Sequence, residues 1–162
     1  MLEKIKPKIR TYAIAIAIPL AVGTLAALLT RGNMNIYGEI NTPPLSPPAF
    51  LFPIVWTALY ILMGISSALV YERRENNPIG ASAGLRFYAI SLFFNFTWSI
   101  IFFNFGSFLF AFIWLLLLLY FVVRTILSYF SVSPLAAYLQ LPYLAWILFA
   151  GYLNFAIWIL NK

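Results

Sequence analysis

The sequence contains no cysteine and no histidine among its 162 residues. A chain without these residues forms no disulfide and has no thiolate nucleophile, no Ser-His-Asp triad and no histidine ligand for zinc or haem iron. Any ligand must therefore be held by other chemistry. We expect no catalytic residue, no metal site and no required cofactor.

Charged residues are also scarce, because 9% of the chain is charged whereas 64% is hydrophobic, and the mean hydropathy is +0.93. Soluble proteins carry about 25% charged residues, so a water-soluble monomer is excluded. Uncharged runs cover residues 11–30, 40–71, 87–123 and 125–161. Each run is long enough for the roughly 20 apolar residues that cross a bilayer as a helix. The sequence therefore predicts an all-α integral membrane protein.

Prolines and small polar residues divide these runs into five spans. The segment 41–48 contains four prolines, which do not fit a helix interior, and the Asn104–Ser107 turn divides a run that is too long for one span. The first span exceeds the usual apolar length of a signal peptide, so we interpret it as retained. We predict one domain, 1–162, as a five-helix bundle with a long ordered loop between helices 1 and 2. The predicted helices are at about 11–30, 48–71, 85–104, 107–128 and 135–160.

Positive charge is distributed unequally between the two ends of the predicted spans. One side carries eight basic residues: Lys4, Lys6, Lys8, Arg10, Arg73, Arg74, Arg86 and Arg124. The other carries Arg31 and Lys162. This asymmetry predicts an inside N-terminus and an outside C-terminus, with Arg124 extending toward the inner interface. No basic stretch alternates with aromatics, so nucleic acid is not an expected partner.

Aromatic residues recur at helical spacing on three of the predicted spans, together with polar groups. Phe52, Trp56 and Tyr60 share one helix face, as do Asn95 and Trp98 on the next stripe. The last span repeats the pattern from Trp146 to Ile157. Amides within hydrocarbon need partners, so we expect Asn95 and Asn154 to face inward. The stripes are compatible with contacts between helices or with a pocket for flat apolar ligands, and both interpretations stay open.

Three segments, 43–60, 95–103 and 141–158, resemble the TspO/MBR family of tryptophan-rich sensory proteins and translocator proteins, once called peripheral benzodiazepine receptors. Their order and spacing extend over nearly the whole chain. The resemblance implies five membrane helices, a long first loop folded over a ligand cavity, and a homodimer. Small residues four apart, such as Ala13, Ala17 and Ala21, also favour close helix contacts.

The resemblance further implies a membrane receptor or carrier for porphyrins, haem-like tetrapyrroles, sterols or isoquinoline- and benzodiazepine-type ligands. Its roles would be in tetrapyrrole handling, transport or stress signalling. Residues that match the family's cavity are Trp56, Tyr60, Asn95, Trp98, Trp146, Phe149, Ala150 and Leu153, with Pro43 and Phe50 at the loop edge. The compact chain shows no additional targeting segment, so we expect a prokaryotic cell membrane.

Two positions depart from the family pattern. Ile36 stands where relatives often have a tryptophan that is implicated in light-dependent porphyrin degradation, and Trp114 replaces a carboxylate of the fourth span. Both changes weaken an enzymatic interpretation, and Trp114 would preserve or enlarge an aromatic cavity. The alternatives are a porphyrin-degrading enzyme that depends on light or oxygen, and a structural or regulatory membrane protein without a small ligand.

Overall fold

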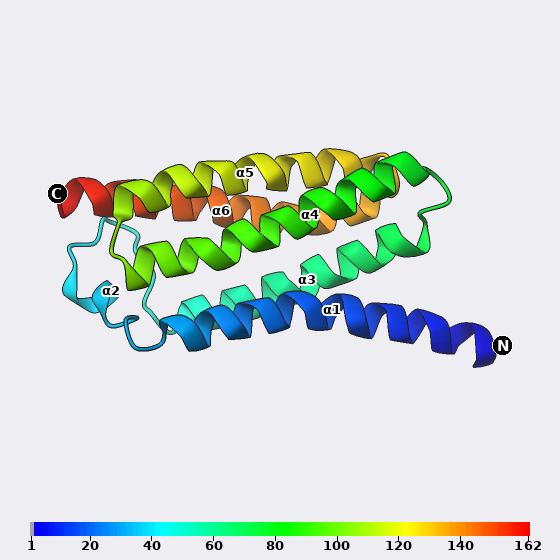
Figure 1. Ribbon diagram of the computed structural model, residues 1–162, viewed down its shortest axis with the longest axis horizontal. Helices are drawn as coiled ribbons and strands as arrows, with labels where there is room; N and C mark the ends of the chain where they lie inside the picture. Colours follow the sequence, from blue (N-terminus) through cyan, green and yellow to red (C-terminus); the bar gives the residue numbers. More distant parts are fainter. Residues whose placement is uncertain (1) are drawn as a thin grey trace.

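Five long helices lie side by side in the computed structural model, with the chain termini at opposite ends of the bundle (Figure 1). The structure describes the backbone of residues 2–162 and the side chains of residues 8–162. The long helices are α1 (Leu2–Thr30), α3 (Leu51–Glu72), α4 (Pro78–Ser99), α5 (Phe108–Phe130) and α6 (Pro134–Leu160). Within the described residues there is no strand, and five helical segments are long and apolar enough to cross a membrane. The prediction of an all-α, five-span protein is confirmed.

The third span begins seven residues before the predicted start at 85. Asn77 caps α4, because its Oδ1 accepts a hydrogen bond of 2.9 Å from the backbone N–H of Gly80, and Pro78 follows at the first helical position. This Asn-Pro pair is a strong signal for a helix start. The predicted start was wrong because the charges up to Arg86 assign residues 72–86 to a polar connection, whereas Arg86 is exposed within α4.

The second span begins later than predicted. Pro47 and Pro48 precede α3, which begins at Leu51, so they are not in its first turn. Pro53 occupies that turn instead, where a missing backbone N–H removes no intrahelical hydrogen bond. At the N-terminus, α1 extends the first predicted span from residue 11 back to Leu2.

The predicted break in the longest apolar run is present. A short π-helix, η1 (Ile100–Asn104), continues α4, and the chain turns through Gly106 before α5 begins. Gly106 has a φ of +59°, a left-handed conformation that glycine adopts without the steric cost of a Cβ atom. The turn therefore returns the chain as an antiparallel neighbour, and α5 packs along α4.

The connection between α1 and α3 contains a single helical turn, α2 (Ile36–Glu39), rather than a plain loop. It is attached to the ends of two spans. The side chain of Asn33 donates to Asn104 Oδ1 at 2.9 Å, and the amide of Asn161 both accepts from the backbone N–H of Asn41 and donates to its carbonyl. Figure 1 shows this segment at the end of the bundle that carries the C-terminus.

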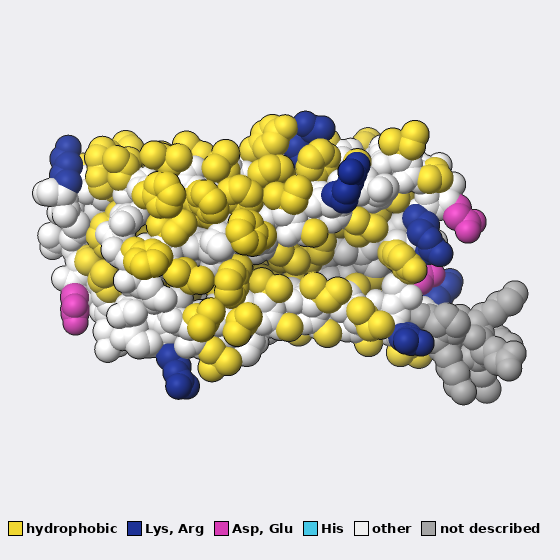
Figure 2. Space-filling model, viewed as in Figure 1, with side chains coloured by type: hydrophobic (Ala, Val, Ile, Leu, Met, Phe, Trp, Pro, Cys, Tyr) yellow, Lys and Arg dark blue, Asp and Glu magenta, His cyan; other side chains and the backbone are white. Residues whose placement is uncertain are grey.

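The face of the bundle seen in Figure 2 is mostly apolar along its length; basic side chains lie near both ends, and two further basic groups lie on its upper part, closer to the middle. Arg124 is exposed, donates to the Tyr120 hydroxyl at 2.8 Å and lies 4.6 Å above the ring of Phe87. Lys4 and Lys6, which contribute to the predicted charge asymmetry, lie outside the described side chains. The orientation of the termini stays a prediction.

Helix α1 packs on α3, which in turn packs on α6. Gly64 of α3 allows the close approach of α1, since a Cβ atom there would lie 2.5 Å from Ile16 Cα. Ala13, Ala17 and Ala21 of α1 are instead exposed on the surface of the bundle. These three alanines are accessible to a second copy of the chain, and the homodimer stays a prediction.

Candidate functional site

A cavity of about 340 Å³ lies inside the bundle near the α2 end. We call it the aromatic cavity. Four long helices, η1 and the α1–α3 connection contribute to its wall. The lining residues are Leu20, Gly23, Thr24, Ala26, Ala27, Thr30, Met34, Tyr37, Ala49, Phe52, Pro53, Trp56, Thr57, Tyr60, Trp98, Ser99, Phe102, Phe103, Trp146, Ala150, Leu153, Asn154 and Ile157. None of these lining side chains is charged.

Aromatic rings from separate helices meet around this space. Trp56 stacks on Tyr60 at a centroid distance of 5.5 Å and meets Trp146 of α6 edge-on at 6.4 Å. On the other wall, Trp98 stacks on Phe102 at 5.2 Å. Such rings present flat apolar faces with a negative electrostatic potential. The wall is therefore suited to stacking against a planar hydrophobic molecule.

A buried amide positions one of these rings. The Oδ1 atom of Asn154 accepts a hydrogen bond of 3.0 Å from Trp98 Nε1, while its Nδ2 atom donates to the Phe108 carbonyl at 2.8 Å. The two bonds connect α4, α5 and α6. As predicted, Asn154 faces inward, and it is 1% exposed.

Asn95 faces inward as well, but it lies behind the cavity wall. Its Nδ2 atom donates to the Tyr143 hydroxyl at 3.0 Å, and the ring of Tyr143 contacts Trp56 edge-on at 6.2 Å. Asn95 is 2% exposed and does not line the cavity. Asn95 was expected to line the cavity. It instead positions Tyr143, whose ring contacts Trp56.

Six of the ten predicted site residues line one cavity: Trp56, Tyr60, Trp98, Trp146, Ala150 and Leu153. Besides Asn95, three others do not line it. Pro43 is buried in the α1–α3 connection, whereas Phe50 is 67% exposed. Phe149 is half-buried against Trp146, at a centroid distance of 5.6 Å. A ligand-binding role for any of the ten stays a prediction.

Trp114, expected to preserve or enlarge the aromatic wall, is not part of it. Its Nε1 atom donates to Thr97 Oγ1 at 2.7 Å, and its ring lies 4.6 Å from that of Phe94. This tryptophan joins α4 to α5 and does not line the cavity. The presence of Trp114 therefore adds no ring to the cavity wall.

Sequence reasoning missed the contribution of α1 and α2. Gly23 of α1 lies directly against the ring of Tyr60, where a Cβ atom would overlap the ring. Gly23 and Ala27 are small residues four apart, a spacing that by itself favours close helix contacts, and both residues line the cavity. A glycine opposite an aromatic stripe could have indicated this, but the opposing helix is not visible in one sequence.

Tyr37 of α2 closes the wall at the loop end. Its hydroxyl donates to the Pro47 carbonyl at 2.9 Å, and its ring meets Phe52 edge-on at 5.2 Å. Burial raises the pKa of the Tyr37 phenol, and hydrogen bonding with Ser46 offsets part of this increase. The phenol therefore stays neutral at physiological pH and retains its hydrogen bond. Its neighbour Ile36 does not line the cavity.

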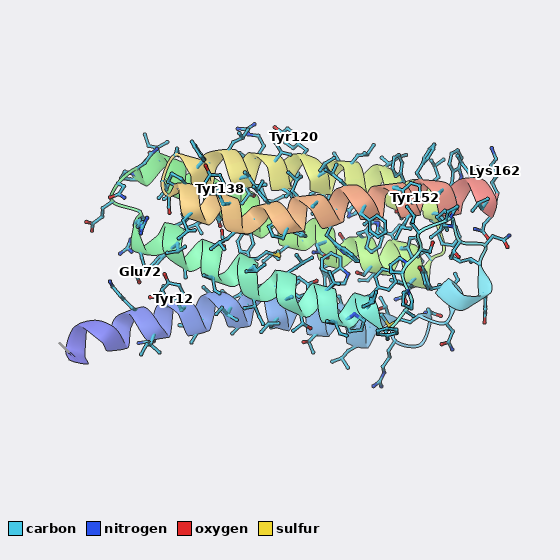
Figure 3. All side chains as sticks on the ribbon, turned by 180° about the vertical axis from the view of Figure 1, so that it is seen from behind. Tyr12, Glu72, Tyr120, Tyr138, Tyr152 and Lys162 are labelled. Atoms are coloured by element: carbon cyan, nitrogen blue, oxygen red, sulfur yellow. The ribbon has the colours of Figure 1, made fainter. Side chains whose placement is uncertain are left out.

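The loop segment is also held from the α6 side. Tyr152 donates to the Pro44 carbonyl at 2.8 Å, and Figure 3 shows Tyr152 and Lys162 toward the same end of the bundle. Together with the Asn41–Asn161 pair, this bond holds the connection across the cavity end. These contacts connect residues more than 100 positions apart in the chain.

Comparisons with known proteins agree with this architecture. The family model described as the TspO/MBR family matches residues 15–159. The chain is 38% identical to the tryptophan-rich protein TspO of Chlorobaculum tepidum, covering 95% of this chain and 98% of that protein. It is 34% identical to protein CrtK of Rhodobacter capsulatus, covering 86% and 85% of the two chains, and 34% identical to the translocator protein of Bos taurus, covering 90% and 86%.

Proposed function

The chain belongs to the TspO/MBR family of integral membrane proteins, and from this premise we propose that it binds a flat hydrophobic ligand of the porphyrin class in the aromatic cavity. The observation that carries the proposal is the convergence of Trp56, Trp98 and Trp146 from three helices on one uncharged space. The binding is noncovalent and serves tetrapyrrole handling, transport or stress signalling.

The cavity chemistry defines how such a ligand lies. Trp56 and Trp146 both line the cavity, and neither indole N–H group has a hydrogen-bond acceptor among the described residues. The wall holds no cation that would neutralise a carboxylate inside the bundle. Burying an unpaired carboxylate is costly. The apolar part of the macrocycle therefore lies inside the cavity, and any acidic substituents stay at the cavity opening.

The size of the cavity also indicates that only part of the macrocycle lies inside it. The volume of about 340 Å³ is near the lower end of the roughly 300–1,000 Å³ that is usual for small-molecule sites. A large macrocycle then fills the space between the tryptophans, while its remaining edge extends past the wall. Smaller flat ligands, such as isoquinolines, fit the same aromatic surfaces and compete with it.

Replacing Trp146 with alanine tests the proposal. We expect saturable binding of protoporphyrin to the wild-type protein in detergent, measured from the ligand's own absorbance and fluorescence. Loss of the ring that contacts both Trp56 and Phe149 raises Kd by about tenfold, equivalent to about 1.4 kcal/mol. The matched control is Trp158→Ala on the same helix, because Trp158 does not line the cavity.

Equal Kd values for the two variants would contradict the proposal, as would unsaturable binding by the wild-type protein. A protein with only a structural role would show no increase in melting temperature with any hydrophobic ligand, since ligands that bind the folded state must stabilise it. Illumination of the complex separates binding from degradation. Formation of a new chromophore would assign the enzymatic function instead.

A further inference from the structure

A second cavity lies toward the N-terminal end of the bundle, between α1, α3 and α4. Its volume is about 790 Å³, and we call it the lateral cavity. It extends along α1 from Arg10 to Ile18, a rise of about 12 Å at 1.5 Å per residue. No residue lines both this cavity and the aromatic cavity. The two spaces are therefore separate sites in the bundle.

The lateral cavity opens on the outer surface of the bundle. Ile14 and Ile18 on its wall are each 50% exposed, and Ala89 across from them is exposed too. In a bilayer these residues face lipid at the depth of the acyl chains, since they belong to the apolar part of the spans. The inner part of the wall includes Leu92, which is buried. An acyl chain is therefore the group that matches this surface.

A buried hydroxyl without a partner lies in the same wall. Tyr88 is 7% exposed, and its hydroxyl is the one buried side-chain polar atom in the described part of the chain that lacks a hydrogen bond. The nearby Ser67 hydroxyl is hydrogen-bonded to Tyr129 at 2.8 Å and does not form a hydrogen bond with Tyr88. An unpaired buried donor destabilises the folded protein. The hydroxyl oxygen is covered by neighbouring side chains, so a ligand oxygen reaches it when the Tyr88 side chain turns toward the lateral cavity, and that contact would remove the destabilisation.

Positive charge lies at the end of the lateral cavity that is closest to the membrane surface. Arg10 is one of its lining residues, and the Arg74 guanidinium lies 4.2 Å from the ring centroid of Tyr71, another lining residue. Glu72 follows Tyr71 in the chain and does not line the cavity. Figure 3 shows Glu72 and Tyr12 toward this end of the bundle. Guanidinium groups pair strongly with phosphate oxygens.

We propose that the lateral cavity binds one anionic phospholipid from the adjacent leaflet. One acyl chain lies along Ile14, Ile18 and Leu92, an ester carbonyl accepts the hydrogen bond of Tyr88, and the phosphate pairs with Arg10. The apolar wall, the unpaired hydroxyl and the cation follow one another from the membrane interior to its surface, in the order of the parts of a phospholipid. The proposal does not depend on what occupies the aromatic cavity.

The test reconstitutes the protein in nanodiscs with equal amounts of phosphatidylglycerol and phosphatidylcholine that carry the same acyl chains. Native mass spectrometry then measures the lipid retained by the released protein. We expect the wild type to retain phosphatidylglycerol in preference. Arg10→Gln reduces this preference by about fivefold, the equivalent of roughly 1 kcal/mol per basic residue near a lipid surface. The matched control Arg86→Gln removes an exposed cation outside the cavity and leaves the preference unchanged.

Two further variants test the roles of the apolar wall and of the Tyr88 hydroxyl in lipid binding. Ala89→Phe places a ring in the opening and reduces retention of both lipids. Tyr88→Phe removes the unpaired hydroxyl, so it lowers lipid retention while it raises the melting temperature of lipid-free protein in detergent. These two variants keep the test informative if Arg10→Gln does not fold, as judged by circular dichroism.

Several outcomes would overturn the proposal. Equal retention of the two lipids by the wild type would contradict a preference for a lipid with a net negative charge. Equal losses of preference in Arg10→Gln and Arg86→Gln would show that the general positive charge of the surface, and not Arg10 itself, selects the lipid. Unchanged retention in both Ala89→Phe and Tyr88→Phe would place the lipid elsewhere. Stabilisation by glycerol phosphate alone, equal to that by the full lipid, would indicate an anion site without a lipid.

Discussion

At the scale of single residues, amides rather than charges hold the interior of the bundle together. Asn154 joins Trp98 of α4 to the Phe108 carbonyl of α5, and Asn95 joins α4 to Tyr143 of α6. An amide offers both donors and an acceptor without the desolvation cost of an ion. In both cases the amide also positions an aromatic ring at or behind the cavity wall.

Asn154→Leu tests this role. The substitution keeps a similar volume but leaves the Trp98 N–H and the Phe108 carbonyl without their partner, so we expect a loss of about 1–3 kcal/mol in stability. Denaturation of the purified protein in mixed micelles measures the change. Thr57→Val is the control, since the Thr57 hydroxyl bonds only to Pro53 of its own helix. A loss no larger than that of Thr57→Val would contradict the role of the amide.

At the scale of elements, the close packing of α1 against α3 depends on a residue without a side chain. Membrane helices gain no hydrophobic advantage from pairing within lipid, so they depend on close contact. Gly64 provides this contact, because the backbone of α1 occupies the space that a Cβ atom would need. Both the aromatic cavity and the lateral cavity have walls from these two helices.

Gly64→Ala should therefore separate α1 from α3. The nearest atoms belong to the α1 backbone and cannot move aside as a side chain would, so we expect a cost of about 1–3 kcal/mol. Thermal unfolding measures this cost, together with a weaker affinity for protoporphyrin. The control is Gly151→Ala, where a Cβ atom meets the flexible end of Leu115 at 3.4 Å. Similar melting temperatures for the two variants would show that the α1–α3 contact is not tight.

At the scale of the whole molecule, an odd number of spans places the two termini on opposite sides of a bilayer. The connection between α1 and α3 lies at the C-terminal end, and the α3–α4 connection lies at the N-terminal end (Figure 1). The distribution of lysine and arginine predicts that the N-terminal end faces the inside. The aromatic cavity would then lie nearer the outer surface.

The absence of cysteine makes this orientation directly testable with single-cysteine variants. We expect a membrane-impermeant maleimide to label Leu45→Cys in intact cells, because Leu45 is 82% exposed in the α1–α3 connection. Asn76→Cys, in the exposed α3–α4 connection, should react only after permeabilisation. The cysteine-free parent protein is the control for background labelling. The reverse pattern would place the N-terminus outside.

The sequence predicts the number and approximate positions of the spans correctly, but it misplaces the residues at which several of them begin. Charge spacing outlined four uncharged runs, because a charged side chain is costly within hydrocarbon, and the length limit of a span together with the Asn104–Ser107 turn gave the fifth helix. Charge spacing misplaced the start of α4 because Arg86 is tolerated on an exposed helix face near the end of the span. The Asn77–Pro78 signal, which depends on backbone hydrogen bonding, located this start better than hydropathy.

The sequence by itself determined the membrane class, the five spans, the aromatic stripes and the lack of thiolate and imidazole chemistry. These properties follow from composition and from the helical period, which are local. Only the tertiary structure decided that Gly23 faces Tyr60, that Asn95 lies behind Tyr143 and that Tyr88 lacks a partner. The physical reason is that each depends on which helices become neighbours and how closely they pack, and no single helix encodes its partner's position.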